Sequence, residues 1–419
     1  GNSSFEDQAL SVALAACLLK NTEAKLKIQF FEARNVGIPG GAAFSPNAIA
    51  DYRNASRFLL NPQFKFTLKS SFLSEISLDV FFQNIERNVE MDPKSQAVNQ
   101  VSKRTSLILV TPTGLHKTVG GKVVAKGEIS NFWEWSGGVD AWQRNIETSR
   151  EKIFKVELLL PDNSVDSVYA QYRGEQPIPD AWFRSTGLFL INNFKLVPEK
   201  LSLDISGRAD LITVGNKQSV DPVYIKTPNG INYSPAGQRV IFAPETNRQT
   251  SWSVDLSALY SPVKSFRFSA MLSKAFRAAS LEERFKYIDL GTKVSLGNQN
   301  LKPEEAWFTN MGMAYQTAKF NAKVDFFVNH VTNFIAEEDG FFVYSYSDTA
   351  LYGQLDTLPA KILGNIHHAR LYGVDGKMSA QLFYGIKIIS SFSFLRGQNL
   401  TSRHRFLAIS PATASVGIG

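Results

Sequence analysis

The sequence predicts an all-β protein: an antiparallel, up-and-down transmembrane β-barrel, to which this chain contributes about fifteen strands. Apolar and polar residues alternate with a period of two along most of the chain, as in strands whose two faces meet different surroundings. The strands are joined alternately by tight turns and by long loops, the order that outer-membrane barrels keep. No stretch holds the roughly 18 consecutive apolar residues of a membrane-spanning helix.

The composition is that of a folded protein. Hydrophobic residues make up 44% of the 419 residues and charged residues 20%, with 31 phenylalanines; this is too apolar for disorder and too polar for a helical membrane bundle. The single cysteine, Cys17, excludes an internal disulfide and a cysteine-based metal site. The net charge of +7 is spread along the chain, so no nucleic-acid partner is expected.

The alternation is clearest in three segments. In residues 201–211 one face carries Leu203 and Ile205, and the other carries Asp204 and Arg208. Because successive side chains of a strand point to opposite faces, one face of this strand is apolar and the other polar. The same pattern recurs in residues 320–328 and 382–394.

Seven strand pairs follow in chain order, each closed by a tight turn, and a last candidate strand lies after Arg405. The expected pairs are 10–20 with 25–35, 57–69 with 75–89, 116–128 with 133–146, 182–196 with 201–214, 252–260 with 266–276, 307–316 with 320–334, and 367–381 with 384–395. Long loops separate the pairs. Most of these strands have about ten residues or more, enough to cross a bilayer at a tilt.

Two segments each allow two interpretations. Residues 9–19 are the most apolar run, but they follow Glu6 and Asp7 and lack a basic start, so they are interpreted as a strand and not a signal peptide. Residues 147–160 fit either a helix or a strand folded within a loop.

Alternation alone also fits a secreted, soluble β-rich binding protein such as an adhesin, whose apolar strand faces turn inward. A passive porin is a further alternative. An enzyme is not expected, because the sequence has no nucleophile elbow, no zinc-protease motif and no phosphate-binding loop. No cofactor is expected either.

Histidines and aromatic residues are the first candidates for ligand binding. His330 ends one strand and His367 begins the next, so both should lie near one rim, where imidazoles could contact a metal-bearing ligand. Isolated surface histidines are commoner, and no firm metal site is predicted. The connecting loop carries four further candidates, which could instead form a small loop core: Phe341, Phe342, Tyr344 and Tyr346.

One long loop carries two motifs. Phe276-Arg277-Ala278-Ala279 opens it, and Asn298-Gln299-Asn300-Leu301-Lys302-Pro303-Glu304 closes it. These segments resemble the F-R-A-P and N-P-N-L-K-P-E segments of TonB-dependent outer-membrane receptors, with Ala279 and Gln299 where the family often has proline. The resemblance extends from about residue 25 to the end of the chain, and residues 373–375 look like the family's G-V-E strand.

The resemblance implies the remaining expectations. The family's barrel has 22 strands and is preceded by a plug domain, so residues 1–419 are expected to be a partial barrel without the plug. The implied function is active import across the bacterial outer membrane, energised through TonB by way of the plug, of an iron chelate or a similar bulky nutrient. The implied partners are TonB, the small-molecule chelate and outer-membrane lipid. For Arg277, Asn298, Asn300 and Glu304, a role in bracing the loop is favoured over direct ligand contact.

Overall fold

The computed structural model describes residues 5–38, 47–290, 293–344, 356–406 and 409–419, and only the backbone of Tyr344, Asp356, Ile366 and His367. Fifteen long strands form one antiparallel meander in which each strand pairs with the next long strand along the chain. They are β1 (Glu6–Leu19), β2 (Thr22–Arg34), β4 (Ile49–Thr67), β5 (Glu75–Asp92), β7 (Lys103–Ser130), β8 (Trp133–Leu159), β10 (Ala181–Val197), β11 (Leu201–Asn216), β16 (Glu245–Val263), β17 (Phe266–Arg277), β20 (Glu304–Gln316), β21 (Phe320–Tyr344), β22 (Asp356–Gln381), β23 (Lys387–Asn399) and β24 (Thr413–Ile418).

Shorter elements lie at one end of this sheet. They are β3 (Val36–Gly37), β6 (Val98–Gln100), β9 (Val165–Glu175), β12 (Ser219–Asp221), β13 (Tyr224–Thr227), β14 (Gly230–Asn232), β15 (Arg239–Phe242), α1 (Leu281–Phe285), β18 (Tyr287–Asp289) and β19 (Val294–Leu296). A 3-10 turn at Phe383–Gly385 belongs to the opposite end. Neither helical segment in the described ranges is long enough to span a membrane.

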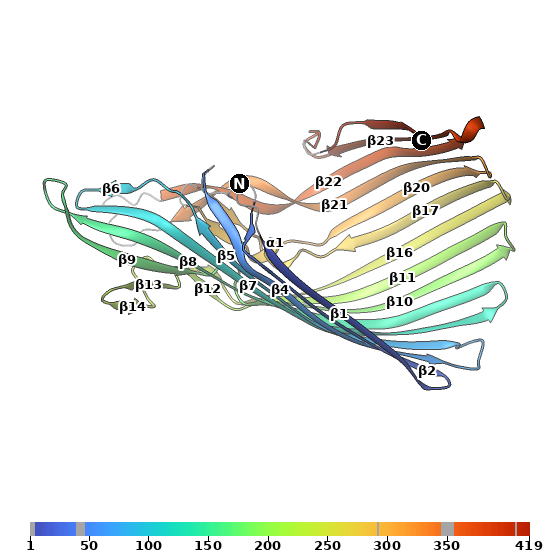
Figure 1. Cartoon of the computed structure of the whole chain (residues 1–419), viewed down its shortest axis with the longest axis horizontal. Coiled ribbons are helices and arrows are strands. Elements are labelled where there is room, and N and C mark those ends of the chain that lie inside the picture. The colour runs from blue at the N-terminus through green and yellow to red at the C-terminus, as the bar shows by residue number, and fades with distance from the viewer. Residues whose placement is uncertain (1–4, 39–46, 291–292, 345–355, 407–408) are drawn as a thin grey trace.

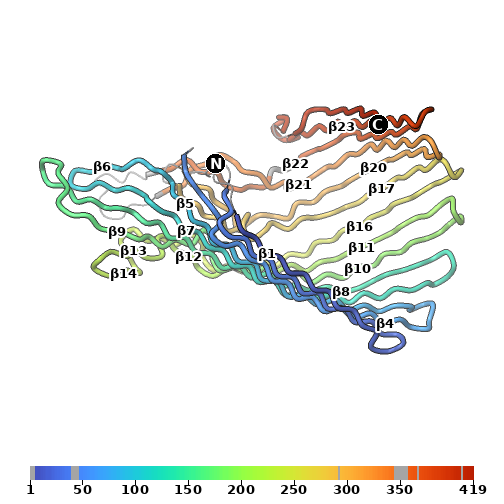
Figure 2. Tube along the Cα trace, in the orientation of Figure 1, coloured from blue at the N-terminus to red at the C-terminus, as the bar shows by residue number. Residues whose placement is uncertain are grey.

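The sheet curves into a trough, and the tight turns that close the seven predicted strand pairs lie at one end (Figure 1). The turn end is at the right of the figure, and β6, β9, β13 and β14 reach out at the left. The trace in Figure 2 shows the long strands tilted side by side between these ends. No ladder in the described part of the chain joins β1 to β24, so the sheet has two open edges. The predicted antiparallel, up-and-down β-barrel architecture and the predicted number of strands are confirmed.

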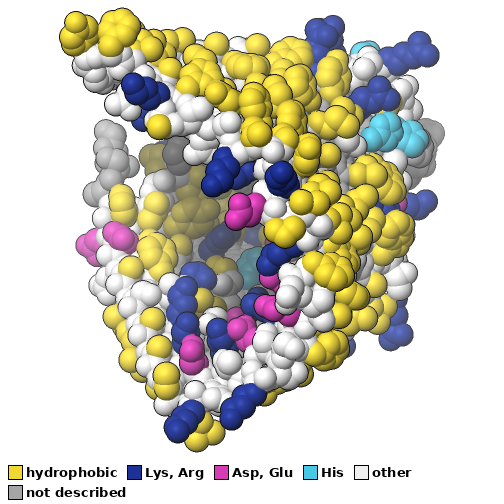
Figure 3. All heavy atoms as spheres, turned by 90° about the vertical axis from the view of Figure 1, so that its right-hand side faces the viewer, with side chains coloured by type: hydrophobic (Ala, Val, Ile, Leu, Met, Phe, Trp, Pro, Cys, Tyr) yellow, Lys and Arg dark blue, Asp and Glu magenta, His cyan; other side chains and the backbone are white. Residues whose placement is uncertain are grey.

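The outer face of the sheet is apolar and exposed. Leu188 lies opposite Val139 on one side and Ala209 on the other, and Ala209 lies opposite Trp252. Leu188 is 63% exposed and Trp252 50% exposed. Figure 3 looks in from the turn end and shows apolar side chains over the outer surface and charged ones inside the hollow. A soluble protein buries its apolar face, so the soluble alternative does not fit, whereas a barrel in a bilayer has this polarity.

Several strands run further toward the long-loop end than the sequence predicts. For residues 147–160, where the sequence allows either a helix or a strand within a loop, the structure has a strand: β8 continues to Leu159. β21 and β22 run up to Tyr344 and back from Asp356, where the sequence predicts a loop. Strands of 25 to 28 residues exceed what a bilayer requires, so their far ends stand in water. There neither face meets lipid, so strict period-two alternation is not required. The turn expected at residues 261–262 lies instead at 264–265.

Candidate functional site

The inner wall carries charged side chains that interact across several strands. Arg208 on β11 donates to its neighbour Asp210 (Nη2 to Oδ1, 2.5 Å) and reaches over β10 to Asp140 on β8 (Nη1 to Oδ2, 2.6 Å). Gly187 of β10 lies beneath the guanidinium, where a Cβ would come within 2.1 Å of Arg208 Nη2. The missing side chain therefore lets one arginine connect three strands on the concave face.

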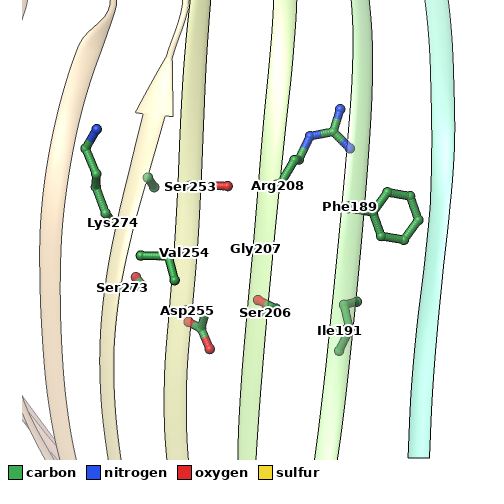
Figure 4. Close-up of a pocket in the computed structure, with 11 residues that line it drawn as sticks. Phe189, Ile191, Ser206, Gly207, Arg208, Ser253, Val254, Asp255, Ser273 and Lys274 are labelled. Atoms are coloured by element: carbon green, nitrogen blue, oxygen red, sulfur yellow. The ribbon is translucent and has the colours of Figure 1, made fainter.

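A recess of about 420 Å³ lies beside Arg208 on the same wall. Figure 4 shows its lining, with Phe189, Arg208 and Asp255 contributed by β10, β11 and β16. The lining mixes apolar and charged groups, and it is formed by one face of adjacent strands. This surface can line a passage but does not enclose a ligand.

The long-loop end holds the main buried core of the described chain. Segments from the wall and from three loops pack together there through apolar side chains. The cluster comprises Ile146, Ala181, Ile212, Val214, Phe242, Leu281, Phe285, Tyr287, Val294 and Ala360. Because the wall residues among them face inward, the loops fold in over the mouth of the barrel as a packed layer.

The loop of residues 278–303 is the centre of this layer. Ser280 caps helix α1: its side chain accepts a hydrogen bond from the Glu283 backbone N–H (3.1 Å), and the Glu283 carboxylate accepts one from the Ser280 N–H (2.8 Å). Arg277 donates to Glu283 (2.8 Å) and to Glu304 (2.7 Å), so it clasps the two ends of the loop. Burial raises the pKa of Glu283, but the hydrogen bonds from Arg277 and from the Ser280 backbone N–H outweigh burial, so the pKa lies below its ordinary value.

The residues of the second motif also brace the loop. Asn298 Oδ1 accepts from the Asn300 backbone N–H (2.9 Å), and Glu304 accepts from the backbone N–H of Ile335 (2.8 Å). Both contacts agree with the expected bracing role. The remaining motif residues are placed as follows: Phe276 packs against the main core cluster, Leu301 is buried with Ala279, Ile335 and Leu363, the Lys302 N–H donates to Asn365, and Pro303 is half-buried.

Two contacts help to fix this loop to the rest of the mouth. Glu282 of α1 pairs with Arg144 on the inner wall of β8. The backbone N–H of Tyr287 donates to the Pro177 carbonyl (2.7 Å). Basic residues gather on the same wall. His116 lies opposite Ile146 of β8, and Ile146 is two residues along β8 from Arg144. On β5, Arg87 is two residues from the residue that lies opposite His116. A basic patch therefore lies beneath α1.

Four basic residues and two carboxylates form a buried network beside the loop. Glu175, 3% exposed, pairs with Arg150 (2.5 Å), Lys152 (2.9 Å) and Arg173 (3.0 Å). Burial lowers the pKa of Lys152, and Glu175 opposes that effect. Three cations around one carboxylate leave a positive excess on this side of the network.

The network continues into the loops. Asp221 of β12 accepts from Arg173 (2.9 Å) and from the Tyr287 hydroxyl (3.0 Å), and Arg239 of β15 donates to the same hydroxyl (2.7 Å). Burial, and next the charge of Asp221, raise the pKa of Tyr287 well above its ordinary range. Four loop segments are thus held together by groups that must all remain paired.

The histidines and aromatic residues are distributed differently from the expected rim site. His330 lies opposite Trp307, on the outer face, and its ring is 6.1 Å from that of His368. The side chain of His367 is outside the described residues. His330 and His367 are therefore not shown to meet, and the described histidine pair is His330 with His368.

The aromatic candidates fall into two groups. Phe342 belongs to the loop core, with its ring 5.6 Å from that of Tyr287 and 4.7 Å from the Arg239 guanidinium, whereas Phe341 is exposed. The side chain of Tyr344 and all of Tyr346 lie outside the described residues. No cluster of three or more metal-ligating side chains occurs among the residues that the structure describes.

Sequence reasoning missed the buried network and the basic patch. The sequence does place the charged residues on common strand faces, because Arg150 and Lys152 are two residues apart, as are Arg173 and Glu175. The partners on other strands and loops could not be paired without the register.

Comparisons with known proteins agree with this geometry. A family model described as TonB dependent receptor-like, beta-barrel matches residues 27–419. No curated protein sequence matches the chain. Among solved structures, the copper transporter OprC is similar with a TM-score of 0.71 at 16% identity, covering 99% of this chain and 56% of its own. The ferric yersiniabactin uptake receptor FyuA from Yersinia pestis is similar with a TM-score of 0.56 at 10% identity, covering 99% of this chain and 56% of its own. The ferric citrate transporter FecA is similar with a TM-score of 0.56 at 12% identity, covering 99% of this chain and 55% of its own. The chain spans little more than half of each of these structures, and the likeness is one of fold.

Proposed function

Because the chain belongs to the TonB-dependent receptor family, whose barrels lie in the bacterial outer membrane, we propose that the protein imports an iron chelate or a similar bulky nutrient. Members of this family are transporters and receptors and not enzymes. In this proposal the ligand binds at the long-loop end, and energy delivered through TonB, by way of a plug domain, moves the ligand inward.

The observation that carries the proposal is the hollow with a polar inner wall beneath a packed loop layer (Figure 3). A hydrophilic ligand can travel along such a wall, which offers hydrogen-bonding groups such as Arg208, Asp140 and Asp210. The loop layer supplies a fixed surface for recognition at the mouth.

The charge at the mouth favours an anionic ligand. Arg87 and Arg144 face the hollow beside His116, and Glu282 is the acidic partner of Arg144. Ferric complexes of carboxylate and catecholate chelators carry negative charge, and basic groups in a cleft with low-dielectric walls attract such ligands and hold them by charge-assisted hydrogen bonds.

The test is uptake by cells that carry the full-length protein. Radiolabelled ferric citrate and a ferric catecholate serve as ligands, with cyanocobalamin and copper ion as comparison cargoes. Uptake of one ferric chelate should require both the protein and TonB. Equal uptake without TonB would contradict active import and favour a passive pore, and uptake confined to cobalamin or copper would contradict the iron-chelate assignment.

A double variant tests whether the basic residues at the mouth contact the imported ligand. Arg87→Gln/Arg144→Gln should weaken binding of the imported chelate about tenfold, because each lost charge-assisted hydrogen bond costs on the order of 1.5–3 kcal/mol before compensation by water. Arg267→Gln is the control, since Arg267 is exposed like Arg87 and faces inward, but at the turn end of β17. Equal losses in the two variants would show that the effect is not local.

A further inference from the structure

A row of basic and aromatic side chains crosses four strands on the outer face. Lys274 lies opposite Trp307, Trp307 opposite His330, and His330 opposite Arg370. Directly opposite residues of antiparallel strands have Cβ atoms about 4.5–5.5 Å apart. The four side chains therefore form one continuous row from β17 to β22.

This row marks the upper edge of the apolar belt. On the same face and toward the turn end, the next residues of β20 and β21 include Met311 and Phe326, which lie opposite each other and are 60% and 59% exposed. Such large apolar side chains are covered by lipid acyl chains in a barrel. The row above them lies where the headgroups of the outer leaflet begin, and Trp307 there fits the aromatic girdle of a membrane interface.

Lys274, the first cation of the row, already has partners within the protein. Lys274 is 6% exposed, pairs with Glu305 (3.1 Å), and has its ammonium group 3.8 Å from the centre of the Trp252 ring. Burying a charge on this face requires such compensation. Lys274 is thus a fixed part of the wall.

The other basic groups lack a carboxylate partner among the residues that the structure describes. Arg370 and Arg396 are exposed, and in the described ranges no carboxylate forms an ion pair with either. Arg396 lies opposite Tyr372, two residues from Arg370 on the neighbouring strand, and its guanidinium lies over the Phe394 ring. His368 is exposed beside His330. Two guanidinium groups and two imidazoles therefore meet the headgroup layer together.

We propose that Arg370, Arg396, His330 and His368 bind the phosphate group of an outer-leaflet lipid headgroup. Guanidinium groups donate two parallel hydrogen bonds to phosphate oxygens, and an imidazole donates at least one in either protonation state. The apolar belt below accepts the acyl chains of the same lipid. The site is independent of the import ligand, because it lies on the opposite face of the sheet from the hollow.

The experiment measures lipid binding to the full-length protein in detergent by native mass spectrometry. Dioleoyl phosphatidic acid is titrated against dioleoyl phosphatidylcholine, which has the same chains and no net charge, and against inorganic phosphate. Phosphatidic acid should bind about tenfold more tightly than phosphatidylcholine. His368→Gln/Arg370→Gln should remove that preference, and Arg396→Gln alone should reduce it.

The control is Lys377→Gln, which removes one positive charge from the opposite face of β22 and should leave the preference intact. Folding of each variant is checked by heat-modifiable migration in gels. Equal binding of the two lipids by the unaltered protein, or an unchanged preference in the two folded variants, would overturn the proposal. Displacement of the lipid by inorganic phosphate at equal concentration would overturn the lipid assignment.

Discussion

Arg284 donates a hydrogen bond of 2.8 Å to the backbone carbonyl oxygen of Leu301, 17 residues further along the chain. A second bond joins Arg284 to the Gln299 carbonyl (2.6 Å), and the side chain is only 1% exposed. One buried guanidinium therefore satisfies carbonyl groups that would otherwise be buried without partners. This arrangement makes the 278–303 loop a compact body with its own core.

Replacing this arginine should loosen the loop. Arg284→Met keeps an apolar stem but leaves two carbonyl groups unpaired, each costing about 1–3 kcal/mol. Proteolysis within residues 278–303 should become faster, while the barrel remains folded. Lys286→Met is the control in the same loop, because its ion pair with Glu337 is partly exposed and contributes about 0–1 kcal/mol. Equal protease sensitivity of both variants would contradict this role.

The buried network predicts a large effect for one carboxylate. Glu175→Gln leaves three cations without their shared anion, and breaking a buried pair in this way costs about 3–5 kcal/mol. Hydrogen exchange along β8 and β9 should accelerate. Glu134→Gln is a matched substitution, since its partner Lys195 is half-exposed, and its effect should stay below about 1 kcal/mol. If the backbone amides of β9 exchange rapidly in the unaltered protein, the network does not anchor this strand.

The Arg277–Glu283 pair predicts a dependence on acid. The pKa of Glu283 in the folded state is lower than its ordinary 4.5, so its stabilising contribution is fully present above that value and is lost as the pH falls through the lowered pKa. The stability difference between the unaltered protein and Glu283→Gln should therefore be constant near neutral pH and shrink in acid. A difference that grows on acidification would have the wrong sign.

The two faces of β10 can be tested by one substitution at two positions. Leu188→Arg places a charge in the apolar belt, which costs about 2–4 kcal/mol near the bilayer midplane, so assembly in the membrane should fall. Ile191→Arg places the same charge on the inner wall beside the recess, where it should be tolerated. The heat-modifiable fraction in isolated outer membranes measures both, and the reverse order of effects would invert the face assignment.

The sequence by itself determined the architecture. Period-two alternation gives each residue its face, as with Leu203 and Asp204, and the contrast between tight turns and long loops gives the order of the hairpins. Both are local properties of the chain, so they can be read without contacts. The motif residues from Phe276 to Glu304 also indicate the family without any long-range contact.

Only the tertiary structure decided which residues meet. His330 contacts His368, and Arg208 reaches Asp140 across Gly187, because strand register and curvature bring together residues 38 and 68 positions apart. The inward fold of the loops likewise depends on the long-range contacts of Tyr287, Asp221 and Glu175. Pairings at such separations follow from the register between neighbouring strands and the curvature of the sheet, and the local alternation of side chains carries no information about them.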